Sequence, residues 1–159
     1  MAIQRIIEQK KNEELLTVHE IEDNQWQDEH FIESLIEDHK RKGQLKQAYL
    51  ITVEMYLQSS KKEKWKLKKR YLLEDYSLKV LKSAKKLTSS KTKLLEDVRF
   101  LLDEWNNGSE GCYAEKPHVL ATEIGKLFCE IQRELGHHEL ANKVARRLSL
   151  PQAYQDRKK

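Results

Sequence analysis

The chain has 159 residues, a net charge of +4 and a charged fraction of 35%, which fits one soluble domain that can fold without a metal or a disulfide. Its five glycines and two prolines are too few for a β-rich or irregular fold, which needs turn residues more often. The sequence therefore predicts an all-α protein, in which long helices are joined by short connections.

The chain begins with an acidic segment, residues 1–26. Within it, residues 2–17 predict a helix with an interrupted apolar stripe, and the polar residues 19–26 predict a linker. A helical domain is expected over residues 27–151, and the polar residues 152–159 predict a flexible tail.

The helical domain is expected to open with an antiparallel helical hairpin. Asp28 is a suitable N-cap for a helix that runs to about Arg41. The apolar residues of this segment recur at helical spacing, so one face is predicted to be buried. Gly43 can adopt the left-handed conformation that ends such a helix, and a second amphipathic helix follows at once.

Residues 60–87 contain no helix-breaking residue, and they predict one long helix or two shorter ones. Three lysines complicate this helix because they lie on its apolar side: Lys62, Lys66 and Lys69. For that reason residues 61–70 are expected to project into solvent, or the helix is expected to break near Lys69.

The last part of the chain predicts three more helices. Ser89 or Ser90 is a suitable N-cap for the first, which ends at the polar loop of residues 106–111. Pro117 suits the first turn of the second helix. Gly136 is expected to end that helix and to start the turn into the short last one.

The two glycine turns are followed by small or apolar residues at the same spacings. These residues are Ala48, Thr52 and Met55 after Gly43, and Ala141, Ala145 and Leu148 after Gly136. The pattern resembles the tetratricopeptide repeat over residues 28–57 and 121–151. The resemblance implies a superhelix of helical hairpins that binds a partner peptide or helix, and it implies no chemistry.

The resemblance is partial. In place of the family's first-helix signature of Trp, Leu-Gly and Tyr, the chain has Ile32, Leu35-Ile36 and His39, and then Gly125, Phe128-Cys129 and Gln132. Residues 58–116 show no copy of the pattern in register, and the two glycines are not separated by a multiple of the family's period. A generic bundle of antiparallel helices is the alternative.

The charges are unevenly distributed along the chain. Residues 1–40 carry four basic and eleven acidic groups, a net charge of −7, whereas residues 41–93 carry sixteen basic and four acidic groups, a net charge of +12. Basic groups along one helix could neutralise the phosphates of RNA or DNA, and Trp65 and Tyr71 could stack on bases. The candidate contacts are Lys61, Lys64, Lys68, Arg70, Lys82 and Lys86.

Two further interpretations of the basic segment remain open. It can be a solvated helix face, or it can bind an acidic protein surface. The acidic N-terminal segment is one such surface, within the chain or across a homo-oligomer.

The leading hypothesis is a helical adaptor that binds another protein in a groove formed by the inner helices. Hairpin geometry suggests Tyr49, Val53, Tyr56, Phe128 and Gln132 as contacts. No catalytic site, metal site or cofactor is expected, because no cysteine and histidine pair has the spacing of a zinc site and no phosphate-binding loop occurs. His39 is expected to be a hydrogen-bonded hairpin residue, and Cys129 a small hydrophobic one.

The sequence also predicts an intracellular protein, cytoplasmic or nuclear. Its two cysteines show no disulfide framework. Acid within the first eight residues argues against a signal peptide, and no apolar run approaches the length of a membrane span.

Overall fold

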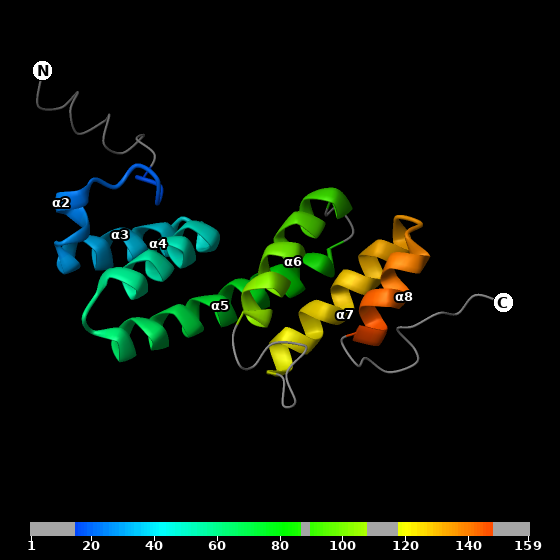
Figure 1. The fold of residues 1–159 in the computed structure, drawn as a ribbon. Coiled ribbons are helices and arrows are strands. Elements are labelled where there is room, and N and C mark those ends of the chain that lie inside the picture. The colour runs from blue at the N-terminus through cyan, green and yellow to red at the C-terminus, as the bar shows by residue number, and fades with distance from the viewer. Residues whose placement is uncertain (1–14, 87–89, 108–117, 148–159) are drawn as a thin grey trace, which may run out of the picture. The chain divides into compact units, whose positions relative to one another are not determined.

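The structure of the chain, a computed structural model, describes residues 15–86, 90–107 and 118–147. These residues form helices and no strand, so the predicted all-α fold is confirmed (Figure 1). The helices are α2 (Asp23–Trp26), α3 (Glu29–Arg41), α4 (Leu45–Gln58), α5 (Lys62–Ala84), α6 (Lys91–Asn106), α7 (Val119–Glu134) and α8 (His138–Arg147). The predicted helix over residues 2–17 falls mostly outside the described residues, and the predicted tail falls wholly outside them.

The chain divides into two compact units, Met1–Leu72 and Leu73–Lys159. The division falls inside α5, so each unit contains one part of that helix. It differs from the sequence-based division, which separates residues 1–26 and 152–159 from one helical domain.

The first unit contains the predicted helical hairpin, α3 and α4 (Figure 1). Asp28 is the N-cap of α3, since its carboxylate accepts a hydrogen bond from the backbone N–H of Phe31 at 3.1 Å. The facing apolar residues Ile32 and Ile51 are fully buried, and so is Ala48. A side chain as small as alanine lets two helices pack closely, so Ala48 suits the interior of the hairpin.

The segment before α3 is not the simple linker that the sequence predicts. It contains the short helix α2, and Ile21 and Trp26 are buried. The carbonyl of Leu16 lies 2.7 Å from Nε2 of His39, and the backbone N–H of Val18 donates to Gln47 at 3.2 Å. These contacts attach residues 16–26 to the hairpin.

Helix α5 runs without interruption from Lys62 to Ala84, so the predicted break near Lys69 is wrong. Two of the lysines on its apolar side are accommodated by Tyr56 of α4. The ammonium groups of Lys62 and Lys69 each lie 5.1 Å from the centroid of the Tyr56 ring, where its negative face attracts a cation. Long lysine stems thus keep their charge outside the core while the helix continues.

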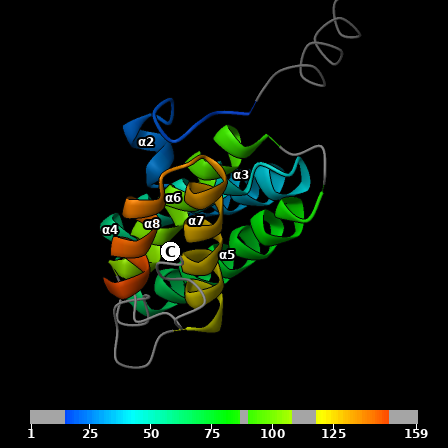
Figure 2. The same ribbon diagram turned by 90° about the vertical axis from the view of Figure 1, so that its right-hand side faces the viewer.

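The second unit contains the later part of α5 with α6, α7 and α8. Helix α7 packs against both α6 and α8 (Figure 2). Ser90 is the N-cap of α6, as predicted, because its hydroxyl accepts from the backbone N–H of Lys93. The indole N–H of Trp105 donates to the hydroxyl of the buried Ser77 at 2.9 Å, which joins α6 to α5.

The turns after α3 and α7 have the same conformation. Gly43 and Gly136 adopt φ values of 74° and 85°, as predicted for helix-ending glycines. In each turn the glycine N–H donates to the carbonyl three residues before it at 3.0 Å, and the next N–H donates to the carbonyl five residues before it at 2.8 Å. This is the Schellman arrangement, which satisfies carbonyls that the end of a helix leaves unpaired.

A side-chain hydrogen bond spans each of the two turns. In the first, Nδ1 of His39 lies 2.8 Å from Oε1 of Gln44. In the second, Oε1 of Gln132 lies 2.7 Å from Nδ1 of His137. The two pairs occupy equivalent positions with histidine and glutamine exchanged, so the likeness of the hairpins extends to a polar contact that their small-residue pattern does not reveal.

Gly136 gives a direct test of the turn. An added Cβ would have no heavy atom within 4 Å, so Gly136→Ala should cost only the conformational strain of a left-handed residue, about 1–2 kcal/mol. Gly136→Asn should cost less, because asparagine adopts this conformation more readily. Urea unfolding of both variants measures these costs. A loss above about 3 kcal/mol for alanine would contradict the open space around this glycine.

Candidate functional site

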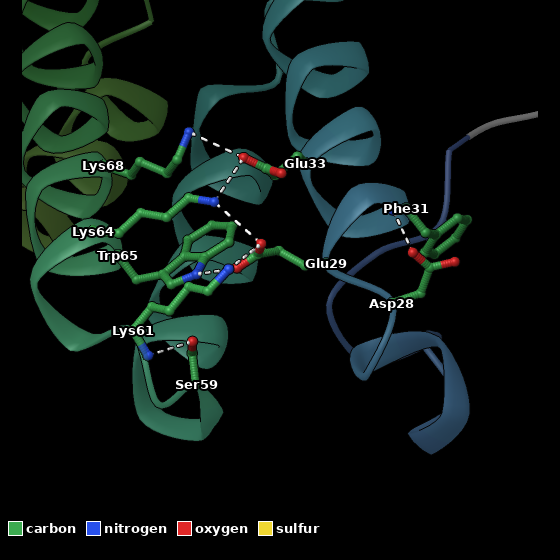
Figure 3. Close-up of polar contacts among 9 residues, drawn as sticks. All are labelled: Asp28, Glu29, Phe31, Glu33, Ser59, Lys61, Lys64, Trp65 and Lys68. Atoms are coloured by element: carbon green, nitrogen blue, oxygen red, sulfur yellow. Dashed lines mark hydrogen bonds and ion pairs between the residues drawn. The ribbon is translucent and has the colours of Figure 1, made fainter.

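A row of charged side chains joins α3 to α5 in the first unit (Figure 3). We call it the charge ladder, formed by Glu29, Glu33, Lys61, Lys64 and Lys68. One carboxylate oxygen of Glu29 lies 3.1 Å from Nζ of Lys61 and 3.2 Å from Nζ of Lys64. Glu33 continues the row, with Nζ of Lys64 at 3.3 Å and Nζ of Lys68 at 3.5 Å.

Local sequence brings the members of the ladder into line. Glu29 and Glu33 are four residues apart on one face of α3, and Lys64 and Lys68 are four residues apart on one face of α5, with Lys61 directly before that helix. Ser59 helps to fix the start of the basic helix, because its hydroxyl accepts from the backbone N–H of Lys61 at 3.0 Å. The result is a seam in which acid from one helix faces base from the other.

Trp65 lies beneath the ladder and is fully buried. Its indole N–H donates to the second carboxylate oxygen of Glu29 at 3.3 Å. Hydrogen bonds from Lys61, and then from Lys64, hold the pKa of Glu29 below its ordinary value. Burial opposes the charge of Lys64, but hydrogen bonds to Glu29 and Glu33 outweigh it and raise the pKa of Lys64.

Three of the six basic residues proposed to bind nucleic acid therefore pair with carboxylates of the chain itself: Lys61, Lys64 and Lys68. Phosphates would have to displace Glu29 and Glu33 to reach them. Trp65 cannot stack on a base while it is buried, whereas Tyr71 is 55% exposed. The acidic surface that these lysines contact is α3, which follows the acidic segment of residues 1–26.

The other three proposed basic contacts have exposed side chains: Arg70, Lys82 and Lys86. Arg70 belongs to the first unit, and the two lysines belong to the second.

The lowered pKa of Glu29 predicts a pH-dependent contribution to stability. A carboxyl group whose pKa falls on folding stabilises the fold above its ordinary pKa of 4.5, and this contribution is lost as the pH falls below that value. Glu29→Gln should therefore lower the melting temperature at pH 7, and its difference from the parent chain should shrink toward zero in acid. Glu37→Gln is the control, since Glu37 forms only an exposed pair within α3. A difference that stays constant down to pH 3 would contradict the pairing.

The structure places the five predicted partner-binding residues mostly inside the hairpins. Tyr49 and Gln132 are fully buried, Phe128 is 6% exposed, and Val53 and Tyr56 are half-buried. The first unit contains Tyr49, Val53 and Tyr56, and the second contains Phe128 and Gln132. A partner could reach Tyr49 or Gln132 only if the hairpin around it opened.

His39 and Cys129 have the structural roles that the sequence predicts for them. Both ring nitrogens of the buried His39 have hydrogen-bond partners. The thiol of Cys129 is buried 3.6 Å from the carbonyl of Ala141, and burial raises its pKa to about 11. In the described ranges, no three histidine, cysteine or acidic residues are grouped so as to hold a metal ion.

The second unit has a surface groove of about 620 Å³ between α5 and α7, near the start of α6. We call it the α5–α7 groove. Its apolar lining is Leu78, Leu81, Ala84, Leu127 and Ile131, and its charged lining is Lys82, Lys85, Lys91, Glu123, Lys126, Glu130 and Glu134.

The apolar lining has a buried part and an exposed part. Leu127 and Ile131 are buried and lie four residues apart on α7. Leu78 of α5 is 53% exposed, although a leucine side chain gains about 1.5–3 kcal/mol when it leaves water. The groove therefore offers apolar surface that a bound molecule would cover.

The charged lining is partly paired. Lys91 of α6 lies 3.2 Å from Glu134, and Lys126 lies 3.5 Å from Glu123. Glu130 lies on the same helix between these pairs. Burial, and then the nearby Glu134 and Glu123, raise the pKa of Glu130 above its ordinary value despite opposing effects of Lys126 and Lys91.

The chain matches no protein-family model, no curated protein and no solved structure with which it was compared. No helix in the part of the chain that the structure describes is long and apolar enough to cross a membrane. The geometry of the two units is therefore what bears on function.

Sequence reasoning did not find the α5–α7 groove. One signal was present, because Leu78 lies off the apolar side of α5 and so has no predicted place in the core. A second was the run of charges on α7 at Glu123, Lys126, Glu130 and Glu134, which flanks Leu127 and Ile131. That the two features lie at one groove depends on the tertiary arrangement of the second unit, which no local pattern specifies.

Proposed function

We propose that the chain is a non-catalytic helical module that binds another protein through the α5–α7 groove. The observation that carries this proposal is the groove itself, in which the half-exposed Leu78 and the buried Leu127 and Ile131 form an apolar floor between charged edges. Apolar centres with polar rims are typical of protein-binding surfaces.

The shape of the groove favours a helix as the bound element. Its lining residues on α7 extend from Glu123 to Glu134, about 17 Å along the helix axis, and those on α5 extend from Leu78 to Ala84, about 9 Å. An amphipathic helix binds in such a groove by placing side chains from two or three successive turns on the apolar floor.

The chemistry of the groove favours binding over catalysis. The described residues of its lining include no serine, cysteine or histidine, the side chains that most often act as nucleophile or general base near neutral pH. Its ionisable groups are lysines and glutamates, of which Lys91, Glu134, Lys126 and Glu123 already form ion pairs.

We include the resemblance to tetratricopeptide hairpins in this proposal. The matching Schellman turns and the exchanged His–Gln pairs support a relationship between the hairpins α3–α4 and α7–α8. The family's use of helical hairpins as a scaffold for peptide binding agrees with the proposed role.

Two matched leucines on α5 test the proposed function. Leu78→Asp places a charge in the groove, and Leu67→Asp is the control because Leu67 is 51% exposed and does not line the groove. In affinity purification from the native cell, we expect Leu78→Asp to reduce recovery of the bound protein at least about tenfold, the effect of losing roughly 1.4 kcal/mol of binding free energy. The control should recover the same protein at the parental level.

Circular dichroism must show that both variants keep the helical content of the parent chain. Equal recovery by the parent and the Leu78→Asp variant would exclude the groove as the binding surface. Loss of recovery with Leu67→Asp alone would place that surface in the first unit.

A further inference from the structure

The edges of the α5–α7 groove carry three charged side chains that form no ion pair with any described residue. Lys82, in the last turn of α5, and Lys85, in the turn directly after it, lie on the α5 side, and Glu130 lies on the α7 side. The other charged lining residues of α6 and α7 are paired with one another.

The surroundings of Glu130 indicate which charge a bound molecule would place on its side of the groove. Its side chain is exposed at the edge of the groove, where partial desolvation and two neighbouring carboxylates, Glu134 and Glu123, disfavour its charge. The cations near it, Lys126 and Lys91, are each paired with one of those carboxylates. A cation on a bound molecule would favour the ionised form of Glu130, since an opposite charge within a few ångströms stabilises a carboxylate.

Lys82 and Lys85 require the opposite charge on the other side of the same groove. Both line the same edge of the groove, so one flank of a bound helix would face both ammonium groups. A ligand that was basic throughout would be repelled by these lysines, and one that was acidic throughout would be repelled by Glu130. Like charges placed together at an interface select against the wrong partner.

We propose that the partner of the α5–α7 groove is an amphipathic helix with flanks of opposite charge, which places its basic flank on Glu130 and its acidic flank on Lys82 and Lys85. This inference rests on the proposed function and specifies its ligand. The apolar face of the helix covers Leu78, and the charged flanks fix the direction in which the helix lies. A bound helix with a given order of flanks therefore has one favourable orientation.

Three synthetic helical peptides of about 18 residues, or five turns, test the inference against the full chain. All carry the same leucine stripe, and they differ in having one basic and one acidic flank, two basic flanks or two acidic flanks. In titration calorimetry at low salt, we expect the peptide with opposite flanks to bind at least about tenfold more tightly than the other two. The difference should shrink in 0.5 M salt, because exposed charges are screened.

Glu130 provides a second readout. Since the basic flank favours its ionised form, binding near pH 5 should release protons, which calorimetry detects as a dependence of the heat on the buffer. Glu130→Gln should abolish the proton release that comes from this residue. It should also lower the affinity for the peptide with opposite flanks about threefold to tenfold. Glu96→Gln on α6, an exposed residue outside the groove, should change neither.

The outcomes separate this inference from the proposed function. If all three peptides bind equally and Leu78→Asp abolishes their binding, the groove binds helices but the opposite-charge inference is wrong. If no peptide binds, or if binding survives Leu78→Asp, both proposals are overturned. If light scattering shows a dimer that Leu78→Asp dissociates, the groove is occupied by a second copy of the chain, and the inferred partner is wrong.

Discussion

Replacing Trp65 by alanine is expected to lower the free energy of unfolding by about 3–5 kcal/mol, the usual cost of removing a buried tryptophan side chain. Trp65 is fully buried, so the substitution removes its apolar contacts and leaves a cavity beneath the charge ladder. It also removes the indole donor of Glu29. Urea unfolding followed by circular dichroism measures the loss without relying on the fluorescence of the deleted residue.

Two further variants identify the cause of that loss. Trp65→Phe keeps an aromatic ring, and Glu29 retains its contacts with Lys61 and Lys64, so this change should cost clearly less than alanine. Lys66→Ala, at an exposed position of the same helix, should stay within about 0.5 kcal/mol of the parent. If Trp65→Ala also stayed within that range, the indole would lie on the surface, where it could stack on a base as the nucleic-acid hypothesis requires.

The helix ends were the most predictable part of the fold, because they depend on residues a few positions apart. Asp28 was predicted as an N-cap, and Ser90 was one of two candidates beside Ser89; in the structure each accepts from the backbone N–H three residues later. Gly43 and Gly136 were identified by the need for a left-handed residue after a helix. Each signal acts within one turn of chain, so tertiary packing has little opportunity to override it.

The continuity of α5 could not be derived in the same way. On a helical projection, Lys62 and Lys69 lie on the apolar side, which predicts a break. Their ammonium groups instead reach the ring of Tyr56 on α4, and Lys62 also donates to the carbonyl of Leu57 at 2.8 Å. The projection treats a lysine as a charge at its Cα, whereas the stem carries that charge several ångströms away.

The interaction surfaces were predictable only where charge alone specified them. The contrast between the acidic residues 1–40 and the basic residues 41–93 predicts that the two segments can attract one another, and the charge ladder contains such contacts. The α5–α7 groove has no comparable signal, because Leu78 and Glu130 lie 52 residues apart in sequence, on different helices. Tyr49 and Gln132, which hairpin geometry suggested as contacts, are buried within their hairpins.

Replacing Trp105 by alanine should have a comparable effect in the second unit, a loss of about 3–5 kcal/mol in the free energy of unfolding. Trp105 is only 4% exposed, and its ring stacks on that of His118 with centroids 4.6 Å apart. Its indole N–H also donates to the buried hydroxyl of Ser77. The substitution therefore removes apolar contacts between α6 and its neighbours and leaves the Ser77 hydroxyl without this partner.

A double-mutant cycle isolates the hydrogen bond from the packing. Ser77→Ala leaves the indole N–H buried without its acceptor, which should cost about 1–3 kcal/mol. Trp105→Phe removes the donor, and once it is gone the serine hydroxyl contributes little. The double variant should therefore lose less stability than the two single changes together, by about 1 kcal/mol in urea unfolding. Costs that add within about 0.5 kcal/mol would mean that the two side chains do not interact, and that α6 is held against α5 by apolar packing alone.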